Sequence, residues 1–338
     1  MEGAANTERR MKAWQMPELG DPWDLLQLAE VTSPVPDAES VRIRVEATDL
    51  NFADILQCQG KYQVRRDPPF TPGINSAGTI VEAGADSGLE VGQRVIGPTM
   101  EGFGGYGEEA LLPAIQCFKL PDAVPSVAAA GMHITFGTSW FALHHRGRLQ
   151  PGETVLVLAA AGGVGSAAVQ MAKSHGCWVV AAAGGDEKTR LCAELGADEV
   201  IDYTNEDLYE RVMALTDKRG VDVVYDPVGG NYFDVARRLL AWEGRLLVVG
   251  FASGTIPSAP ANHALVKNYS VVGVHMGGYR ERDRRPLVRC YRELHQQYID
   301  RKIDPYISEV VGYDGIPEAL HRLGHRGTTG RLVFDPEK

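Results

Sequence analysis

Cysteine is scarce in this chain of 338 residues, and the five that occur are scattered along it. There is no Cys-x-x-Cys pair and no cluster of cysteine with histidine, so the spacing indicates neither a disulfide framework nor a zinc site. Five is also an odd number, which leaves at least one thiol without a partner in the chain. We therefore expect reduced thiols and a cytoplasmic protein.

Long apolar runs are missing as well. The uncharged stretches at 123–145 and 154–172 are broken by Gly, Pro, Ser, Thr or His, so neither predicts a membrane span. Residues 1–10 are polar and no apolar segment follows them, so we expect no signal peptide there but a disordered tail.

Positive charge is also in deficit. The chain has 34 Lys and Arg against 44 Asp and Glu, which gives a formal net charge of −10. That balance argues against nucleic acid or an anionic membrane as the main partner. A hydrophobic content of 44% and a charged content of 23% are typical of a globular protein, and the length has room for two domains.

The most informative segment that is present is the glycine-rich run 159–165, Ala-Ala-Ala-Gly-Gly-Val-Gly. An apolar run at 154–158 precedes it and a helical pattern at 166–173 follows it. Strand, glycine-rich turn and helix together favour nucleotide binding, because the missing side chains let a pyrophosphate approach and the helix N-terminus offers N–H donors. The residues expected to contact a dinucleotide here are Ala161, Gly162, Gly163, Val164 and Gly165.

Beyond this turn, short apolar runs keep alternating with amphipathic segments. This predicts a six-stranded, doubly wound parallel sheet of the Rossmann type, an α/β fold. The first ~125 residues instead show short alternating segments punctuated by Pro and Gly, which predict a mostly β domain. The expected Rossmann strands cover 154–158, 177–183, 199–201, 221–225, 245–249 and 270–274, with helices over 186–195, 205–218 and 232–241.

Several motifs occur in the order of a known family: Asn-Phe-Ala-Asp at 51–54, Gly-Lys-Tyr at 60–62, Pro-Gly-Ile-Asn-Ser-Ala-Gly at 72–78, the glycine-rich turn, and Tyr-Asp-Pro-Val-Gly-Gly at 225–230. With them the chain resembles the zinc-independent quinone oxidoreductases, relatives of zeta-crystallin in the medium-chain dehydrogenase/reductase superfamily, over about 11–334.

The resemblance implies a GroES-like catalytic domain at 11–130 and a Rossmann domain at 131–275, which face each other across a catalytic cleft. It also implies that a C-terminal segment at 276–338 completes the catalytic domain. Members use NADPH and are typically dimeric or tetrameric, so a homodimer is expected. The apolar strand at 270–274 would lie at the sheet edge, where it could pair across a two-fold axis.

The same comparison bears on zinc. Zinc alcohol dehydrogenases of this superfamily carry a catalytic Cys three residues before an Asp, and a His in a Gly-His-Glu segment. Asn51, three residues before Asp54, and Ile74 stand at those positions. An amide and an aliphatic side chain cannot replace a thiolate and an imidazole as zinc ligands. A metal-free protein is therefore expected.

Without a Lewis acid, the plausible chemistry is hydride addition to an acceptor that is already electrophilic, such as a quinone or an enone. By resemblance, Asn51 and Tyr62 line the substrate pocket beside the nicotinamide. Both could donate a hydrogen bond to a carbonyl oxygen, and Tyr62 could relay a proton. The alternatives are that Asn51 is only a turn residue and Tyr62 only an aromatic wall.

The choice of cofactor depends on the end of the second Rossmann strand. NAD enzymes usually place there a carboxylate that binds the ribose 2′-hydroxyl. Here Gly184 follows the strand, at a position where relatives often have Ser, and Asp186 is the first acid. We favour Asp186 as the cap of a helix beginning at residue 187 over Asp186 as a ribose ligand. By resemblance, Lys188 and Tyr203 hold the 2′-phosphate of NADPH, with Arg190 a further cation that could equally face solvent.

Four other residues are expected to contact the cofactor. By resemblance, Thr138 lies at the start of the dinucleotide domain and Arg331 at a basic position close to the phosphates, where its alternative is a solvated surface charge. Phe251 and His275 follow the fifth and sixth strands, at the carboxyl edge where open α/β sheets bind ligands.

Three functions remain open at this point. The first is NADPH-dependent reduction of quinones. The second is an enoyl or alkenal reductase that attacks an activated C=C bond on the same scaffold. The third is a structural or regulatory protein that holds NADPH with little turnover.

Overall fold

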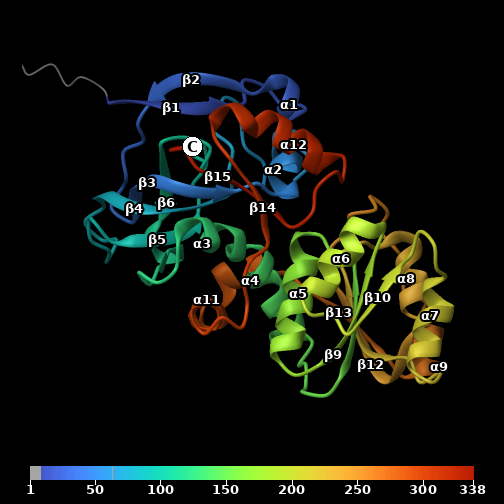
Figure 1. Ribbon diagram of the computed structural model, residues 1–338. Coiled ribbons are helices and arrows are strands. Elements are labelled where there is room, and N and C mark those ends of the chain that lie inside the picture. Colours follow the sequence, from blue (N-terminus) through green and yellow to red (C-terminus); the bar gives the residue numbers. More distant parts are fainter. Residues whose placement is uncertain (1–8, 63) are drawn as a thin grey trace, which may run out of the picture. The chain divides into compact units, whose positions relative to one another are not determined.

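The computed structural model describes residues 9–62 and 64–338, which divide into two compact units (Figure 1). The β-rich unit comprises residues 9–62, 64–133 and 307–338, and the dinucleotide unit comprises residues 134–306. Residues 1–8 of the expected tail lie outside the described residues, whereas Arg10 begins the first strand.

The β-rich unit has a strand pair, β1–β2, and a larger sheet in the order β14-β15-β3-β4-β5-β7, with β6 also paired to β3. Three short helices and α12 accompany these strands. The elements are β1 (Arg10–Gln15), α1 (Pro22–Leu25), β2 (Gln27–Thr32), β3 (Ser40–Asp49), α2 (Phe52–Cys58), β4 (Asn75–Ala83), β5 (Arg94–Pro98), β6 (Glu109–Pro113), β7 (Phe118–Lys119), α3 (Ser126–His133), β14 (Ile307–Val311), α12 (Ile316–Gly324) and β15 (Arg331–Phe334).

Strand β3 organises this unit because its alternate side chains Val41, Ile43 and Val45 are apolar and fully buried. The C-terminal strand β15 pairs antiparallel with the far end of β3, where Val333 lies opposite Asp49. The backbone N–H of Leu50 also donates to Leu332 O at 2.9 Å. The chain thus brings its last residues beside the start of α2, and residues 307–338 belong to the β-rich unit.

The dinucleotide unit is a six-stranded sheet in the order β10-β9-β8-β11-β12-β13, and every neighbouring pair is parallel. This confirms the predicted doubly wound Rossmann sheet. Its elements are α4 (Thr135–Trp140), β8 (Thr154–Leu158), α5 (Gly163–Ser174), β9 (Trp178–Ala183), α6 (Asp186–Glu194), β10 (Glu199–Asp202), α7 (Leu208–Leu215), β11 (Val221–Asp226), α8 (Gly230–Ala236), β12 (Leu240–Val248), α9 (Ala261–Lys267), β13 (Ser270–Gly273), α10 (Tyr279–Arg282) and α11 (Arg285–Ile299).

One predicted helix is too long. The pattern at 232–241 predicts a single helix, but α8 ends at Ala236 and β12 begins at Leu240. Leu240 pairs with Val221 of β11 in the sheet, and the N–H of Val221 donates to Leu239 O at 2.8 Å. Pairing with a neighbouring strand therefore overrides the local helical preference.

The predicted assignment of 276–306 to the catalytic domain is wrong, because this segment belongs to the dinucleotide unit. Its helix α11 packs against α4, where Trp140 Nε1 donates to Glu293 Oε2 at 2.8 Å. Leu287, Tyr291 and Leu294 form the buried side of α11. The amphipathic pattern predicts such a helix but does not say which unit covers its apolar side.

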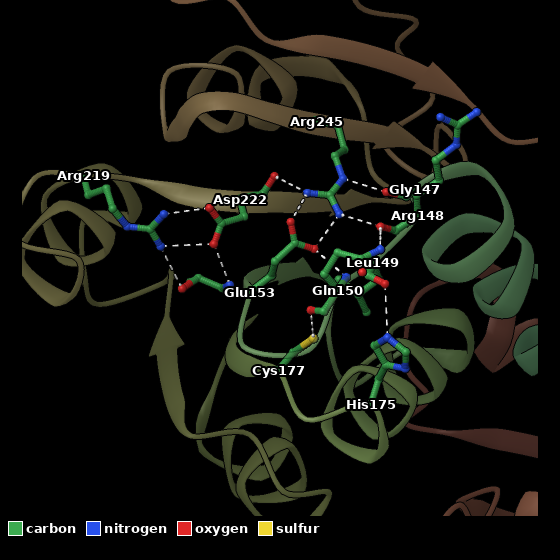
Figure 2. Close-up of polar contacts among 11 residues, drawn as sticks. Gly147, Arg148, Leu149, Gln150, Glu153, His175, Cys177, Arg219, Asp222 and Arg245 are labelled. Atoms are coloured by element: carbon green, nitrogen blue, oxygen red, sulfur yellow. Dashed lines mark hydrogen bonds and ion pairs between the residues drawn. The ribbon is translucent and has the colours of Figure 1, made fainter.

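A polar network fastens the amino ends of the central strands (Figure 2). Arg245 of β12 forms two bonds of 2.6 Å with the carboxylate of Glu153 and donates to Gly147 O at 2.7 Å. Asp222 of β11 accepts from Thr154 N and from Arg219. Because these contacts lie at the amino edge, the carboxyl ends of the strands are left to build a ligand site.

Within the described part of the chain, no helix is both long and apolar enough to cross a membrane. All five cysteines are buried, and none is in a disulfide.

The dinucleotide unit should lose stability in acid because of buried histidines. Burial lowers the pKa of His295, and that of half-buried His144, from 6.5 to about 4. Between these values the unfolded chain binds protons that the folded chain does not, so stability falls as the pH drops from 6.5 towards 4. For His295 the loss is on the order of 3 kcal/mol.

Melting temperatures between pH 4 and pH 7 test this prediction. His295→Leu should make the melting temperature depend less on pH than in the wild type. His325→Gln, at an exposed site in the β-rich unit, should leave the dependence unchanged. An equal dependence in all three proteins would contradict the prediction.

Candidate cofactor-binding and catalytic residues

The glycine-rich turn joins β8 to α5 as the motif predicts. Gly162 is the N-cap of α5, and the first helical turn leaves the N–H groups of Gly163, Val164 and Gly165 without intrahelical acceptors. Ala160 N donates to Ala182 O at 3.0 Å, which holds the turn against the end of β9. A 12-residue helix with these N–H groups at its start suits a diphosphate.

The glycines in this turn serve different purposes. A Cβ at Gly165 would lie 2.2 Å from Ala159 O and 2.8 Å from Ala160 Cα, so only glycine lets the helix approach the strand this closely. A Cβ at Gly162 would meet only Ala159 O, at 3.3 Å. The turn itself therefore has room for a methyl group at Gly162, on the segment where the motif predicts the diphosphate.

Helix α4 brings Thr138 close to this turn. The neighbouring Ser139 donates to Val164 O at 3.0 Å, and its hydroxyl also lies 2.9 Å from the hydroxyl of buried Tyr225. Ser139 thus ties α4 to the start of α5 and to β11. The sequence reasoning missed it, because a lone serine beside Thr138 carries no pattern of its own.

The ends of β9 and β10 form the region expected to hold the 2′-phosphate. A Cβ on Gly184 would lie 2.9 Å from Cε2 of Tyr203, so the missing side chain makes room for the tyrosine ring. The loss of an expected Ser hydroxyl at Gly184 and the presence of Tyr203 are therefore linked by packing. Tyr203 also meets Tyr232 edge-on, with ring centroids 5.3 Å apart.

Asp202 was missed at the sequence level, although its place at the end of a predicted parallel strand was a usable signal. Its carboxylate accepts from Gly185 N at 3.0 Å and from the hydroxyl of Thr204 at 2.6 Å. These hydrogen bonds lower its pKa from 3.8 to about 2. Asp202 therefore joins the ends of β9 and β10 as a carboxylate.

The structure revises the role expected for Asp186. The N-cap of α6 is Gly185, whose φ is +87°, and Asp186 is the first residue of the helix rather than its cap. A carboxylate in the first turn still favours the positive end of the helix. Lys188 lies half-buried in the same turn, whereas Arg190 is exposed and its Nε donates to Asp186 O at 3.3 Å.

A second tight turn follows β11, and the segment after β12 packs against it. Buried Asp226 accepts from Val228 N at 2.8 Å and from Gly229 N at 2.9 Å. Gly229 has a φ of +67°, and a Cβ there would lie 3.0 Å from Cδ1 of Phe251. The exposed Phe251 ring thus packs against the Gly-Gly turn, and His275 is exposed after β13.

In the β-rich unit, Asn51 is the N-cap of α2 and is 5% exposed. Its backbone N–H donates to Asp54 Oδ2 at 2.8 Å. Its side-chain Oδ1 accepts from Arg331 Nη2 at 2.7 Å, and Nδ2 makes two long contacts, of 3.5 Å, with Asp49 O and Asn75 Oδ1. The Asn51 side chain also interacts with the Asp49 carboxyl group, whose pKa it lowers against the effect of burial. The structure therefore brings together Asn51 and Arg331, which lie far apart in the sequence.

Two buried carboxyl groups surround Asn51. Burial, reinforced by the charge of Asp49, raises the pKa of Asp54 to about 7. Burial also raises the pKa of Asp49, against the opposing charge of Arg331. Asp54 accepts from the backbone of Asn51 and from Ile74 N, at 2.9 Å. It therefore holds the α2 N-terminus beside Ile74, the residue that precedes β4.

The donor set at this position does not fit zinc. Asn51 offers an amide, Ile74 offers no ligand atom, and both oxygens of Asp54 accept backbone N–H groups. Among the residues that the structure describes, no three His, Cys, Asp or Glu side chains gather to hold a metal. Tyr62 lies half-buried after α2, and its N–H donates to Leu56 O at 3.1 Å.

Comparison with known proteins places these features in one family. Residues 37–122 match the model of the alcohol dehydrogenase GroES-like domain, and residues 163–292 match that of the zinc-binding dehydrogenases. Quinone oxidoreductase-like protein 2 of Bos taurus is 41% identical over 311 residues, which cover 91% of this chain and 88% of the relative. This chain belongs to the zinc-independent quinone oxidoreductase family.

Solved quinone oxidoreductases have the same fold. The enzyme of Pseudomonas syringae pv. Tomato DC3000 superposes with a TM-score of 0.88 at 30% identity, covering 96% of this chain and 100% of that one. The Escherichia coli quinone oxidoreductase, solved in complex with NADPH, gives a TM-score of 0.87 at 26% identity, with the same coverage of both chains. The GroES-like domain together with the Rossmann domain agrees with the fold class that the sequence predicts.

Proposed function

We propose that this protein is an NADPH-dependent oxidoreductase that reduces quinones without a metal. The observation that carries the proposal is Asn51, which stands where zinc alcohol dehydrogenases have a ligating cysteine. Its Oδ1 accepts from Arg331, and the two hydrogen bonds of Nδ2, to Asp49 O and Asn75 Oδ1, are long at 3.5 Å. Membership of the quinone oxidoreductase family supports the same reaction.

The dinucleotide unit has residues that suit each part of the cofactor, which would supply reducing equivalents from its nicotinamide. The N–H groups of Gly163–Gly165 would hold the diphosphate. Lys188 and Tyr203 would hold the 2′-phosphate, a group that a cation and a phenol can both bind by charge or hydrogen bonding. The NADPH complex of the Escherichia coli relative supports this choice. The remaining expected cofactor contacts are Thr138, Ala161, Gly184, Phe251 and His275.

On the acceptor side, a quinone is already electrophilic, so a hydrogen-bond donor can replace a Lewis acid. We propose that Asn51 Nδ2 donates to the carbonyl oxygen on which negative charge develops, and that Tyr62 is a second donor or proton source. No step in this scheme needs a metal.

The test is oxidation of NADPH, followed at 340 nm, with an ortho-quinone acceptor and with NADH run in parallel. Rapid turnover that prefers NADPH is the expected result. Turnover with an enone but not with the quinone would instead make the protein an enoyl or alkenal reductase. No turnover with either acceptor would favour an NADPH-binding protein with little catalysis.

Lys188 should decide the preference for NADPH. We expect Lys188→Ala to weaken NADPH binding by about 10-fold, the typical value of a charge-assisted hydrogen bond, and to leave NADH binding unchanged. Titration of both cofactors at fixed ionic strength measures this. Arg190→Ala is the matched control, since Arg190 is an exposed cation on the same helix. Equal losses of affinity for NADPH and NADH would show that Lys188 does not bind the 2′-phosphate.

We also propose a cytoplasmic homodimer. Strand β13 is an edge strand in which Val271 is 40% exposed, and Leu265 of the preceding helix α9 is 81% exposed. Antiparallel pairing of β13 with a second copy would satisfy the open edge and cover these side chains. Five buried, unbridged cysteines suit a reducing compartment.

Light scattering tests the oligomeric state. The wild type should have twice the mass of the chain, and Val271→Lys should shift it towards the monomer by placing a charge in the paired edge. A monomeric wild type would dispose of the homodimer.

A further inference from the structure

The side-chain amide of Asn51 can adopt two orientations, related by a half-turn that exchanges the positions of Oδ1 and Nδ2. The proposed reaction needs the nitrogen, because only N–H can stabilise a developing oxyanion. The sequence leaves this choice open, and the backbone of α2 does not decide it either.

Arg331 decides it. A guanidinium carries only donors, so the atom of Asn51 that lies 2.7 Å from Arg331 Nη2 has to be the acceptor, Oδ1. Rotating the amide by half a turn would place its NH₂ group against the guanidinium, with no acceptor between them. The amide nitrogen is thereby directed away from Arg331, and its two contacts there are at the 3.5 Å limit.

Arg331 is itself held in place. The same Nη2 contacts Asp49 Oδ2 at 2.5 Å and Leu50 O at 3.1 Å. The Asp49 side chain is fully buried and that of Arg331 nearly so. Burying an ion pair costs desolvation free energy. The attraction between the two charges offsets that cost only when the geometry is good and further hydrogen bonds are made. Here the further contacts, with Leu50 O and Asn51 Oδ1, are all made by Nη2, whose two hydrogens are shared among three acceptors. Among the described residues, Arg331 Nε and Asp49 Oδ1 have no hydrogen-bond partner, so the pair holds Asn51 through Nη2.

The contact also depends on the fold. Arg331 opens β15, whose pairing with the end of β3 places it beside Asn51. Its 6% exposure describes a residue built into the β-rich unit rather than a solvated surface charge.

We infer that Arg331 is a positioning residue, which holds Oδ1 of Asn51 so that the amide nitrogen is presented to the carbonyl oxygen of the acceptor. This inference rests on the proposed function. This differs from the phosphate contact that the family resemblance implies. A phosphate ligand would act on NADPH affinity, whereas a positioning residue acts on turnover through Asn51.

Arg331→Lys is the test variant. It keeps the charge opposite Asp49 but ends one bond short of the position of Nη2, so it should lose Asn51 Oδ1. We expect kcat to fall about 10-fold and the Kd for NADPH to stay within about 2-fold. In an Asn51→Ala background, Arg331→Lys should not lower kcat further, because the amide that Arg331 holds is absent.

Arg42→Lys is the matched control. Arg42 forms an equally buried pair with Glu109 in the same unit, at 2.7 Å, without contacting Asn51. It should leave kcat unchanged. A 10-fold rise in the Kd for NADPH on Arg331→Lys, an additive loss in the double variant, or an equal fall in kcat for Arg42→Lys would each overturn the inference.

A readout that does not need turnover separates this inference from the proposed function. The chain has seven asparagines, so ¹⁵N-asparagine labelling gives few side-chain amide signals, and Asn51→Ala assigns the one of interest. That signal should shift in Arg331→Lys and should not shift in Arg42→Lys. Asp49→Asn should shift it as well, and this variant replaces Arg331→Lys if the latter does not fold. An unmoved signal would overturn the inference even if quinone is reduced. If the wild type reduces no quinone, the proposed function fails and the signal alone still tests the contact.

Discussion

Gly162→Ala is expected to weaken NADPH binding by about 100-fold, which is about 2.7 kcal/mol, while the protein stays folded. The backbone at Gly162 has a φ of −78° and a ψ of 174°, which any residue adopts. The added methyl would meet no protein atom closer than Ala159 O at 3.3 Å, so its effect should fall on the bound diphosphate. Fluorescence titration with NADPH and thermal melting together measure the two quantities.

Gly165→Ala is the informative counterpart. Its Cβ would lie 2.2 Å from Ala159 O, so the backbone of the turn has to shift, at a cost of about 3 kcal/mol. We expect a lower melting temperature as well as weaker binding. If Gly162→Ala left the NADPH affinity unchanged, the diphosphate would not lie against this turn. If Gly165→Ala melted like the wild type, the helix would not need its close approach to β8.

Asn51→Ala is expected to lower kcat about 100-fold and to leave the Kd for NADPH within about 2-fold. One well-placed donor to a developing oxyanion is worth about that factor. At a pH where the introduced carboxyl group is ionised, Asn51→Asp should lose as much, because the carboxylate keeps the shape and can accept from Arg331 but has no hydrogen to donate. Steady-state turnover with the ortho-quinone and a direct binding titration give both quantities.

Loss of a helix cap has to be separated from loss of a donor, since Asn51 is also the N-cap of α2. Asp207→Ala provides the comparison, because Asp207 caps α7 by accepting from Glu210 N. Its removal should cost about 1 kcal/mol of stability and leave kcat unchanged. A normal kcat in Asn51→Ala, or in Asn51→Asp at a pH where its new carboxyl group is ionised, would show that the amide donates nothing to the reaction.

Much of the dinucleotide unit could be read from local pattern. Its strands are short apolar runs between glycine-punctuated helices, so the number of strands follows from the pattern. Their order, β10-β9-β8-β11-β12-β13, is that of the Rossmann fold, which the glycine-rich turn indicates. The turn at 159–165 was recognisable because its chemistry, missing side chains before a helix, is local to a few residues. The exact end of α8 was not, because Leu240 is placed by pairing with Val221 across the sheet.

The catalytic region could be read only in part. Asn51 and Tyr62 were singled out by the motifs around them and by resemblance. Asp49 and Asp202 lie in no such motif, and Asp54 was noted only as the last residue of the 51–54 motif. The significance of Asp49 and Asp54 depends on burial, and that of Asp202 on hydrogen bonds to residues after neighbouring strands. A carboxylate in a sequence looks the same whether it is solvated or buried.

By itself, the sequence determined the Rossmann sheet, the glycine-rich turn and the absence of zinc ligands at Asn51 and Ile74, because each depends on residue type and short-range spacing. Only the tertiary structure decided that 276–306 packs with the dinucleotide unit, that Gly184 makes room for Tyr203, and that Arg331 meets Asn51. The last contact joins residues 280 positions apart. Such a contact arises from the pairing of β15 with β3, and no local pattern encodes which distant strand a segment will join.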